Sequence, residues 1–129
     1  MTNHQISPAN SIFVFGSNLF GRHGAGSALA ARRFHGAVYG RGSGRQGNSY
    51  AIPTKDYELK TLPLKDIKPF VDDFIDYAKL HKELMFNVVR IGCGLAGYKD
   101  EQIAPLFIRA PSNCRLPPKW RELFTKELE

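Results

Sequence analysis

Two mostly apolar runs that each stop at a glycine constrain this chain more than any other feature. Residues 11–15 read Ser-Ile-Phe-Val-Phe and end at Gly16, and residues 84–91 end at Gly92. A short apolar run is typical of a strand buried on both faces of a sheet, as in parallel sheets covered by helices. The chain is therefore expected to place two such strands in one sheet with helices on both sides.

Helical patterns separate these runs. Residues 25–34 are rich in alanine without proline, and residues 65–81 repeat apolar side chains at helical spacing, with Pro69 expected in the first turn. The alternation predicts an α/β fold with three layers, α/β/α, around a central mixed, mostly parallel sheet. Weaker patterns predict a strand over 50–52, an irregular loop over 36–47 with a short strand around Val38 and Tyr39, a helix over 101–109, an edge strand over 113–116 and a helix over 118–128.

Composition sets several classes of protein aside. The 129 residues suit a single domain over 1–129, and no apolar run approaches the roughly 18 residues of a membrane span. The segment Met1 to Asn10 is polar and uncharged, unlike a secretory signal. Cys93 and Cys114 form neither a metal-binding spacing nor a disulfide framework. We therefore expect a cytoplasmic protein with no membrane partner, no metal and no cofactor.

The positive charge is concentrated in one part of the chain. There are 18 basic and 12 acidic residues, for a net charge of +6. Residues 1–55 hold six bases and no acid, so the remaining twelve bases and twelve acids cancel. This imbalance predicts an anionic partner, either a small phosphorylated ligand or a nucleic acid.

The loop after the first run has the composition of a phosphate-binding loop. It reads Gly-Ser-Asn-Leu-Phe-Gly-Arg-His-Gly-Ala-Gly over 16–26 and leads into the first predicted helix. A helix N-terminus presents unpaired N–H groups and attracts phosphate, and glycine allows the backbone to approach a ligand closely. Ser17, Asn18, Arg22 and His23 add donors. The alternative is a loop that serves only the packing of helix on sheet.

A second loop, residues 91–98, follows the other apolar run. Its three glycines can turn N–H groups toward an oxygen-rich ligand, and Tyr98 can stack on a base or cap the core. Two such loops at neighbouring strand ends would hold a diphosphate between them. The candidate ligand-binding residues are Gly16, Ser17, Asn18, Gly21, Arg22, Gly24, Ala25, Gly26 and Ser27 in the first loop, and Gly92, Cys93, Gly94, Leu95, Ala96, Gly97 and Tyr98 in the second.

These two loops resemble those of the macro domain family, the ADP-ribose-binding α/β/α modules. The similarity rests on Val14-Phe-Gly-Ser-Asn18, Gly21 and His23-Gly-Ala-Gly-Ser-Ala28 for the first phosphate loop, and on Val89-Arg-Ile-Gly-Cys-Gly-Leu-Ala-Gly-Tyr98 for the second. Tyr50-Ala-Ile-Pro-Thr54 is similar to the strand between them. The resemblance implies that Asn18 contacts the distal ribose, that residues 24–27 bind the diphosphate, and that residues 94–98 bind its other side.

Catalytic groups are harder to identify. His23 beside the first loop and Asp56 after the strand over 50–52 are candidate acid/base residues, with Asn18 for positioning. Each also has a structural interpretation: His23 as a surface histidine, and Asp56 as part of a solvated turn. For Arg41 and Arg45, a lid that reaches a phosphate is the preferred interpretation, beside an RNA-contacting segment and ordinary solvated charges.

The sequence therefore predicts a protein that binds ADP-ribose or a related nucleotide, with three alternatives left open. In the first, the protein hydrolyses an ADP-ribosyl or terminal phosphate group. In the second, it sequesters a cyclic or ADP-ribose-type nucleotide signal without cleaving it. In the third, it is a small basic protein that binds RNA or DNA.

Overall fold

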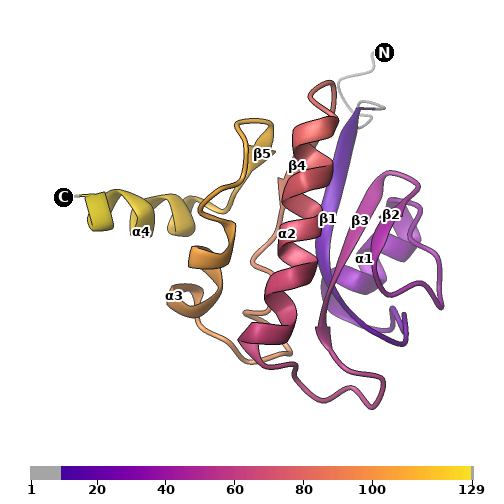
Figure 1. Cartoon of the computed structure of the whole chain (residues 1–129). Coiled ribbons are helices and arrows are strands. Elements are labelled where there is room, and N and C mark those ends of the chain that lie inside the picture. The colour runs from indigo at the N-terminus through magenta and orange to yellow at the C-terminus, as the bar shows by residue number, and fades with distance from the viewer. Residues whose placement is uncertain (1–9, 129) are drawn as a thin grey trace.

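A computed structural model describes residues 10–128, so the N-terminal segment apart from Asn10 lies outside the described part of the chain. One sheet contains all five strands (Figure 1). The strands are β1 (Ser11–Asn18), β2 (Gly44–Gln46), β3 (Ser49–Lys55), β4 (Met85–Val88) and β5 (Cys114–Arg115). The helices are α1 (Gly26–Phe34), α2 (Leu64–Leu80), α3 (Asp100–Ile103), the 3-10 helix η2 (Ala104–Phe107) and α4 (Pro118–Leu128).

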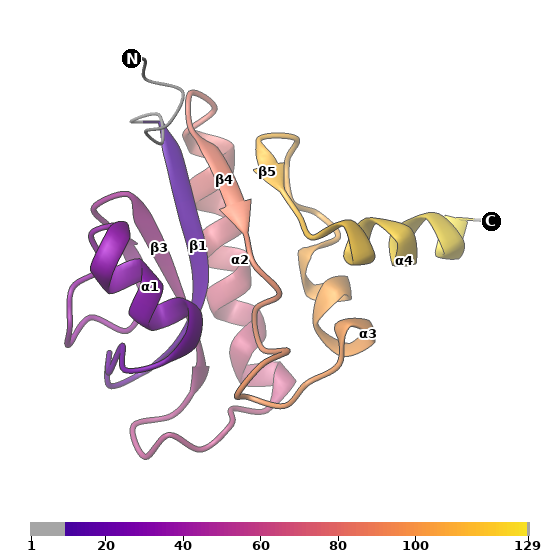
Figure 2. The ribbon, with the colours of Figure 1, turned by 180° about the vertical axis from the view of Figure 1, so that it is seen from behind.

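The sheet is mixed and mostly parallel, in the order β2-β3-β1-β4-β5. β1 pairs in parallel with both β3 and β4, β4 pairs in parallel with β5, and only β2 is antiparallel to its neighbour. Figures 1 and 2 show α2 on one face of the sheet and α1 on the opposite face. The predicted α/β fold, with helices on both faces of a mixed, mostly parallel sheet, is confirmed.

The central strand β1 is buried on both faces, as its apolar run predicts. Ile12 and Val14 belong to the larger core cluster, which also holds the buried face of α2. Phe15 lies in the other cluster, with alanines of α1. Because successive side chains of a strand point to opposite faces, one run of residues serves both cores.

Two prolines mark departures from the predicted helices. Pro69 is the sixth residue of α2, so its missing N–H falls in the second turn and not in the first. The helix expected over 101–109 is instead α3 followed by η2, which has Pro105 at its start. Residue 105 cannot donate the hydrogen bond that would continue the α-helix.

The prediction of a strand at Val38 and Tyr39 is wrong. Both residues are exposed, and the strand of this segment is β2, which begins at Gly44. The expected final helix has the predicted bounds, and its Trp120 is fully buried. Within residues 10–128, no helix combines the length and apolar character that crossing a membrane requires.

Candidate functional site

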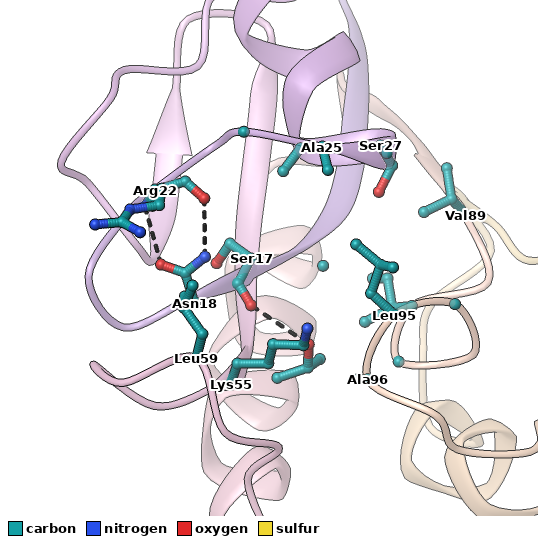
Figure 3. Close-up of a pocket in the computed structure, with 18 of the residues that line it drawn as sticks. Ser17, Asn18, Arg22, Ala25, Ser27, Lys55, Leu59, Val89, Leu95 and Ala96 are labelled. Carbon is teal, nitrogen blue, oxygen red and sulfur yellow. Dashed lines mark hydrogen bonds between the residues drawn. The ribbon is translucent and has the colours of Figure 1, made fainter.

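A pocket of about 690 Å³ lies at the carboxyl ends of the parallel strands. The chain passes from β1 through α1 to the β3 side of the sheet, and α2 then returns it to β4 on the other side of β1. Ligands of α/β proteins bind at such a switch point. The lining residues are Gly16, Ser17, Asn18, Arg22, Gly24, Ala25, Gly26, Ser27, Ala28, Thr54, Lys55, Leu59, Val89, Arg90, Ile91, Gly92, Gly94, Leu95 and Ala96 (Figure 3).

The first turn of α1 forms one wall of this pocket. Ala25 is the N-cap and provides no side-chain cap, and the turn contains no acidic residue. The N–H of Leu29 donates to the carbonyl oxygen of Ala25 at 3.2 Å, which starts the helical bonding. The N–H groups of residues 26–28 precede that bond, so they have no acceptor within the helix. They supply donors and partial positive charge at the pocket wall.

Asn18 holds the first loop closed. Its Nδ2 donates to the carbonyl oxygen of Arg22 at 2.8 Å, and the N–H of Arg22 donates to Asn18 Oδ1 at 2.9 Å (Figure 3). The side chain is buried and lines the pocket. Both ends of its amide thus serve the loop, and this is a positioning role within the ligand site.

The glycine-rich stretch 36–47 supports the first loop from outside. The hydroxyl of Ser17 donates to the carbonyl oxygen of Gly42, and the N–H of Gly40 donates to the carbonyl oxygen of Gly21 at 2.8 Å. A Cβ at Gly42 would collide with the carbonyl oxygen of Asn18. The two loops therefore pack backbone to backbone.

The pocket lining gives the lid interpretation of this stretch no support. No residue of 36–47 lines the described pocket. Arg45 donates to Tyr77 Oη at 2.9 Å and to the carbonyl oxygen of Gly47 at 2.6 Å, and Arg41 donates to the carbonyl oxygen of Arg45 at 3.4 Å. The polar side chain of Gln46 is buried and ties Val38 and Arg41 together. These bonds hold the stretch in place as a scaffold.

The second loop forms the opposite wall through Gly92, Gly94, Leu95 and Ala96. It is braced from the segment before α2: Tyr98 Oη donates to the carbonyl oxygen of Leu62 at 2.5 Å, and Thr61 Oγ1 donates to that of Ala96 at 2.9 Å. Tyr98 is thus a brace, not part of the pocket lining.

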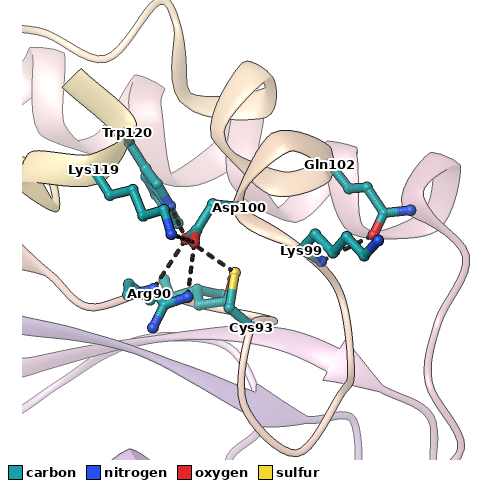
Figure 4. A network of polar contacts seen from close by, with 8 residues as sticks. Arg90, Cys93, Lys99, Asp100, Gln102, Lys119 and Trp120 are labelled. Carbon is teal, nitrogen blue, oxygen red and sulfur yellow. Dashed lines mark hydrogen bonds and ion pairs between the residues drawn. The ribbon is translucent and has the colours of Figure 1, made fainter. Parts of the chain in front are cut away.

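Asp100 connects the second loop to the C-terminal helix (Figure 4). Its buried carboxylate accepts two bonds from Arg90, at 3.0 and 2.7 Å, and one from Trp120 Nε1 at 2.7 Å. Cys93 Sγ lies 3.5 Å from the same carboxylate and so points away from the pocket. The bonds from Arg90 hold the pKa of Asp100 well below its usual range, and burial raises the pKa of Cys93 to about 11.

The charged groups of the pocket are all cationic. Arg22, Lys55 and Arg90 line it, and no Asp or Glu does among the residues that the structure describes. Arg90 is neutralised in part by Asp100, whereas Lys55 stands beside Asn18 in the register of β1 and β3. The pocket therefore suits an anion.

A strained turn supplies an apolar contact at the pocket. Leu59 has φ +66°, a left-handed conformation that is costly for a leucine. Asp56 Oδ1 stabilises the turn by accepting the N–H groups of Glu58 and Lys60 at 2.8 and 2.9 Å. The carboxylate of Asp56 is thus used as a turn support, and the residue is not part of the lining.

His23 is fully buried beside Phe15, with the two ring centroids 5.4 Å apart. It does not line the pocket, and neither of its ring nitrogens has a hydrogen-bond partner among the described residues. Burial lowers the pKa of His23. The position does not suit a group that exchanges protons with a ligand.

Acid should therefore weaken the fold through His23. An unfolded histidine takes up a proton as pH falls below about 6.5, whereas the folded side chain resists it, so unfolding becomes easier as pH falls toward the lowered pKa of the folded state. We expect the unfolding free energy to drop by up to about 1.4 kcal/mol per pH unit in this window. Urea denaturation of wild type and His23→Leu between pH 7 and pH 5 measures it. An equal slope for both proteins would contradict the assignment.

The structure brings most of the predicted ligand residues into one pocket. Four of them, Gly21, Cys93, Gly97 and Tyr98, support the loops without lining it, and so do the acid/base candidates His23 and Asp56. The lining also includes seven residues outside the predicted ligand set: Ala28, Thr54, Lys55, Leu59, Val89, Arg90 and Ile91. Thr54 and Lys55 follow the predicted strand over 50–52. Because the carboxyl ends of parallel strands meet at one edge of the sheet, that position could have indicated both as lining residues.

Comparison with protein-family models, with curated proteins and with solved structures finds no match to this chain.

Proposed function

We propose that the pocket binds a small nucleotide with a diphosphate or similar anionic group, of the ADP-ribose type. The observation that carries the proposal is the pocket itself, in which the first turn of α1 faces a glycine loop and the described lining holds three cations and no Asp or Glu. Its volume lies in the range of ligand sites, about 300–1,000 Å³. The resemblance of both loops to macro domain phosphate loops points the same way.

Each part of such a ligand has a fitting surface. The N–H groups of residues 26–28 suit one phosphate, and the backbone of residues 94–96 suits its neighbour. Arg22 and Lys55 add charge beside Asn18. Leu59 and Leu95, both on the lining, offer apolar contact to a base or ribose.

Binding without turnover is the version that we favour. The ionisable side chains of the described lining are Arg22, Lys55 and Arg90, whereas His23 is buried away from the lining and Asp56 supports a turn. A hydrolase needs a group within reach of the bond that it cleaves. Recovery of intact ligand after prolonged incubation is the expected result, and release of phosphate or free ADP-ribose would restore the hydrolase alternative.

Calorimetric titration with ADP-ribose, ADP and adenosine tests the proposal. We expect binding of the two phosphorylated ligands, no measurable binding of adenosine, and a loss of about 100-fold or more in Gly26→Glu, because the new carboxylate would repel the diphosphate. Gly26 has φ +56°, and no other atom lies within 4 Å of a Cβ built at this position.

Gly40→Glu is the matched control. Gly40 also has a positive φ and open space, and it does not line the pocket. The charge change is thus the same, and φ +96° at Gly40 is less favourable for glutamate than φ +56° at Gly26. Affinity in Gly40→Glu should still stay near the wild-type value, because the new carboxylate lies outside the pocket. No binding at millimolar ligand, or equal losses in both variants, would refute the proposal.

A further inference from the structure

Two exposed aromatic rings, one in the first loop and one in the 36–47 stretch, each have an arginine side chain over them. Phe20 is 45% exposed and Tyr39 is 49% exposed. Arg22 Cζ lies 5.4 Å from the centroid of Phe20, and Arg32 Cζ lies 5.6 Å from that of Tyr39. In each pair the guanidinium lies over one face of a ring that is about half exposed, so a positive charge stands next to exposed aromatic surface.

The two pairs belong to one surface. The N–H of Gly40 bonds to the carbonyl oxygen of Gly21, and Gly21 packs against the backbone of Gly40 and Arg41. Residues 20–22 therefore lie against residues 39–41, and the exposed Arg41 follows Tyr39 by two positions. We call Phe20, Arg22, Arg32, Tyr39 and Arg41 the arginine–aromatic strip.

The scaffold under the strip is held by hydrogen bonds and contains no acidic residue. The bonds of Ser17 and Gly40 fix the 36–47 stretch to the first loop, and those of the Gln46 side chain hold the stretch together. The chain has no carboxylate before Asp56, so the first loop, α1 and the stretch supply bases alone. The strip begins at the pocket, because Arg22 belongs to both.

We propose that the arginine–aromatic strip binds single-stranded nucleic acid. Guanidinium groups pair with phosphates, and exposed rings stack on bases, which is how strands are bound without sequence preference. A duplex hides its bases from such rings, and an acidic peptide offers them nothing to stack on. The proposal does not depend on which ligand the pocket holds.

Fluorescence anisotropy with a labelled oligothymidylate and an oligouridylate of about 12 nucleotides tests it, at low salt and over a salt series. Tyr39→Ala is expected to weaken binding about 5-fold or more through lost stacking. Arg32→Gln is expected to reduce the slope of log K against log salt by about 0.7, the value for one phosphate contact on a single strand.

Arg115→Gln and Tyr57→Ala are matched controls, since both residues are exposed outside the strip. They should leave affinity near the wild-type value, and thermal unfolding should show all variants folded. Three results would each overturn the proposal: no binding at low salt, equal affinity for a duplex or polyglutamate, or unchanged affinity in Tyr39→Ala.

Discussion

Replacing Asp100 by asparagine is expected to lower the free energy of unfolding by about 2–3 kcal/mol, the scale of hydrogen bonds to a charged group. The carboxylate is 3% exposed and accepts bonds from Arg90 and from Trp120. An amide would have to turn an NH₂ group toward one of these donors. Denaturation followed by the emission of Trp120, the single tryptophan, measures the loss and reports on its surroundings.

Asp72→Asn is the control for this substitution. Asp72 also pairs with a base, Lys68 at 2.7 Å, but both side chains are about half exposed. Exposed pairs of this spacing contribute only about 0.3–0.5 kcal/mol.

The low pKa of Asp100 adds a test at acid pH. Because the pKa is depressed in the folded state, the stabilisation is complete above the usual carboxyl pKa near 4 and is lost as pH falls below it. The Asp100→Asn protein should lose less stability than wild type over that range. Equal unfolding free energies for Asp100→Asn and wild type at neutral pH would show that the Asp100 carboxylate does not hold α4 in place.

Gly42→Ala is expected to destabilise the protein by about 1–3 kcal/mol or more, the usual cost of overpacking. The added methyl would meet the carbonyl oxygen of Asn18 and the backbone of Leu19. Relief requires the 36–47 stretch and the first loop to separate. We therefore also expect the variant to lose affinity for any ligand of the pocket.

Gly94→Ala separates crowding from the general cost of losing a glycine. Neither Gly42 nor Gly94 has a positive φ, and nothing lies within 4 Å of a Cβ built at Gly94. Its melting temperature should stay close to that of wild type. If thermal unfolding shows equal shifts for the two variants, the close packing of the two loops is not what stabilises them.

The strands and long helices of this fold could be predicted because each is governed by local pattern. The apolar run of β1 and the spacing in α2 both reflect burial directly. β2 could not be predicted in the same way. Its three residues, Gly44–Gln46, pair with Ala51, Tyr50 and Ser49 across the two-residue turn Gly47-Asn48, so the available signal was that turn and not an apolar run.

The site was predictable to the level of its two loops, but not to the level of individual side chains. Glycine patterns identify where backbone can approach a ligand, and twelve of the sixteen candidate ligand residues line the pocket. The direction of a side chain within a loop depends on which residues the fold brings beside it: Cys93 turns to Asp100, Tyr98 reaches Leu62, and His23 packs on Phe15. No local pattern contains those partners.

The two outer strands of the sheet have a consequence for the protein at high concentration. A long, unpaired strand edge invites a strand from another molecule to add to it. Here the edges are β2 and β5, of three and two residues, and Pro117 and Pro118, without N–H groups to donate, follow β5 closely. The apolar β1, the strand most suited to self-association, is paired on both sides at the centre. The strand order therefore shields the protein from edge-to-edge aggregation.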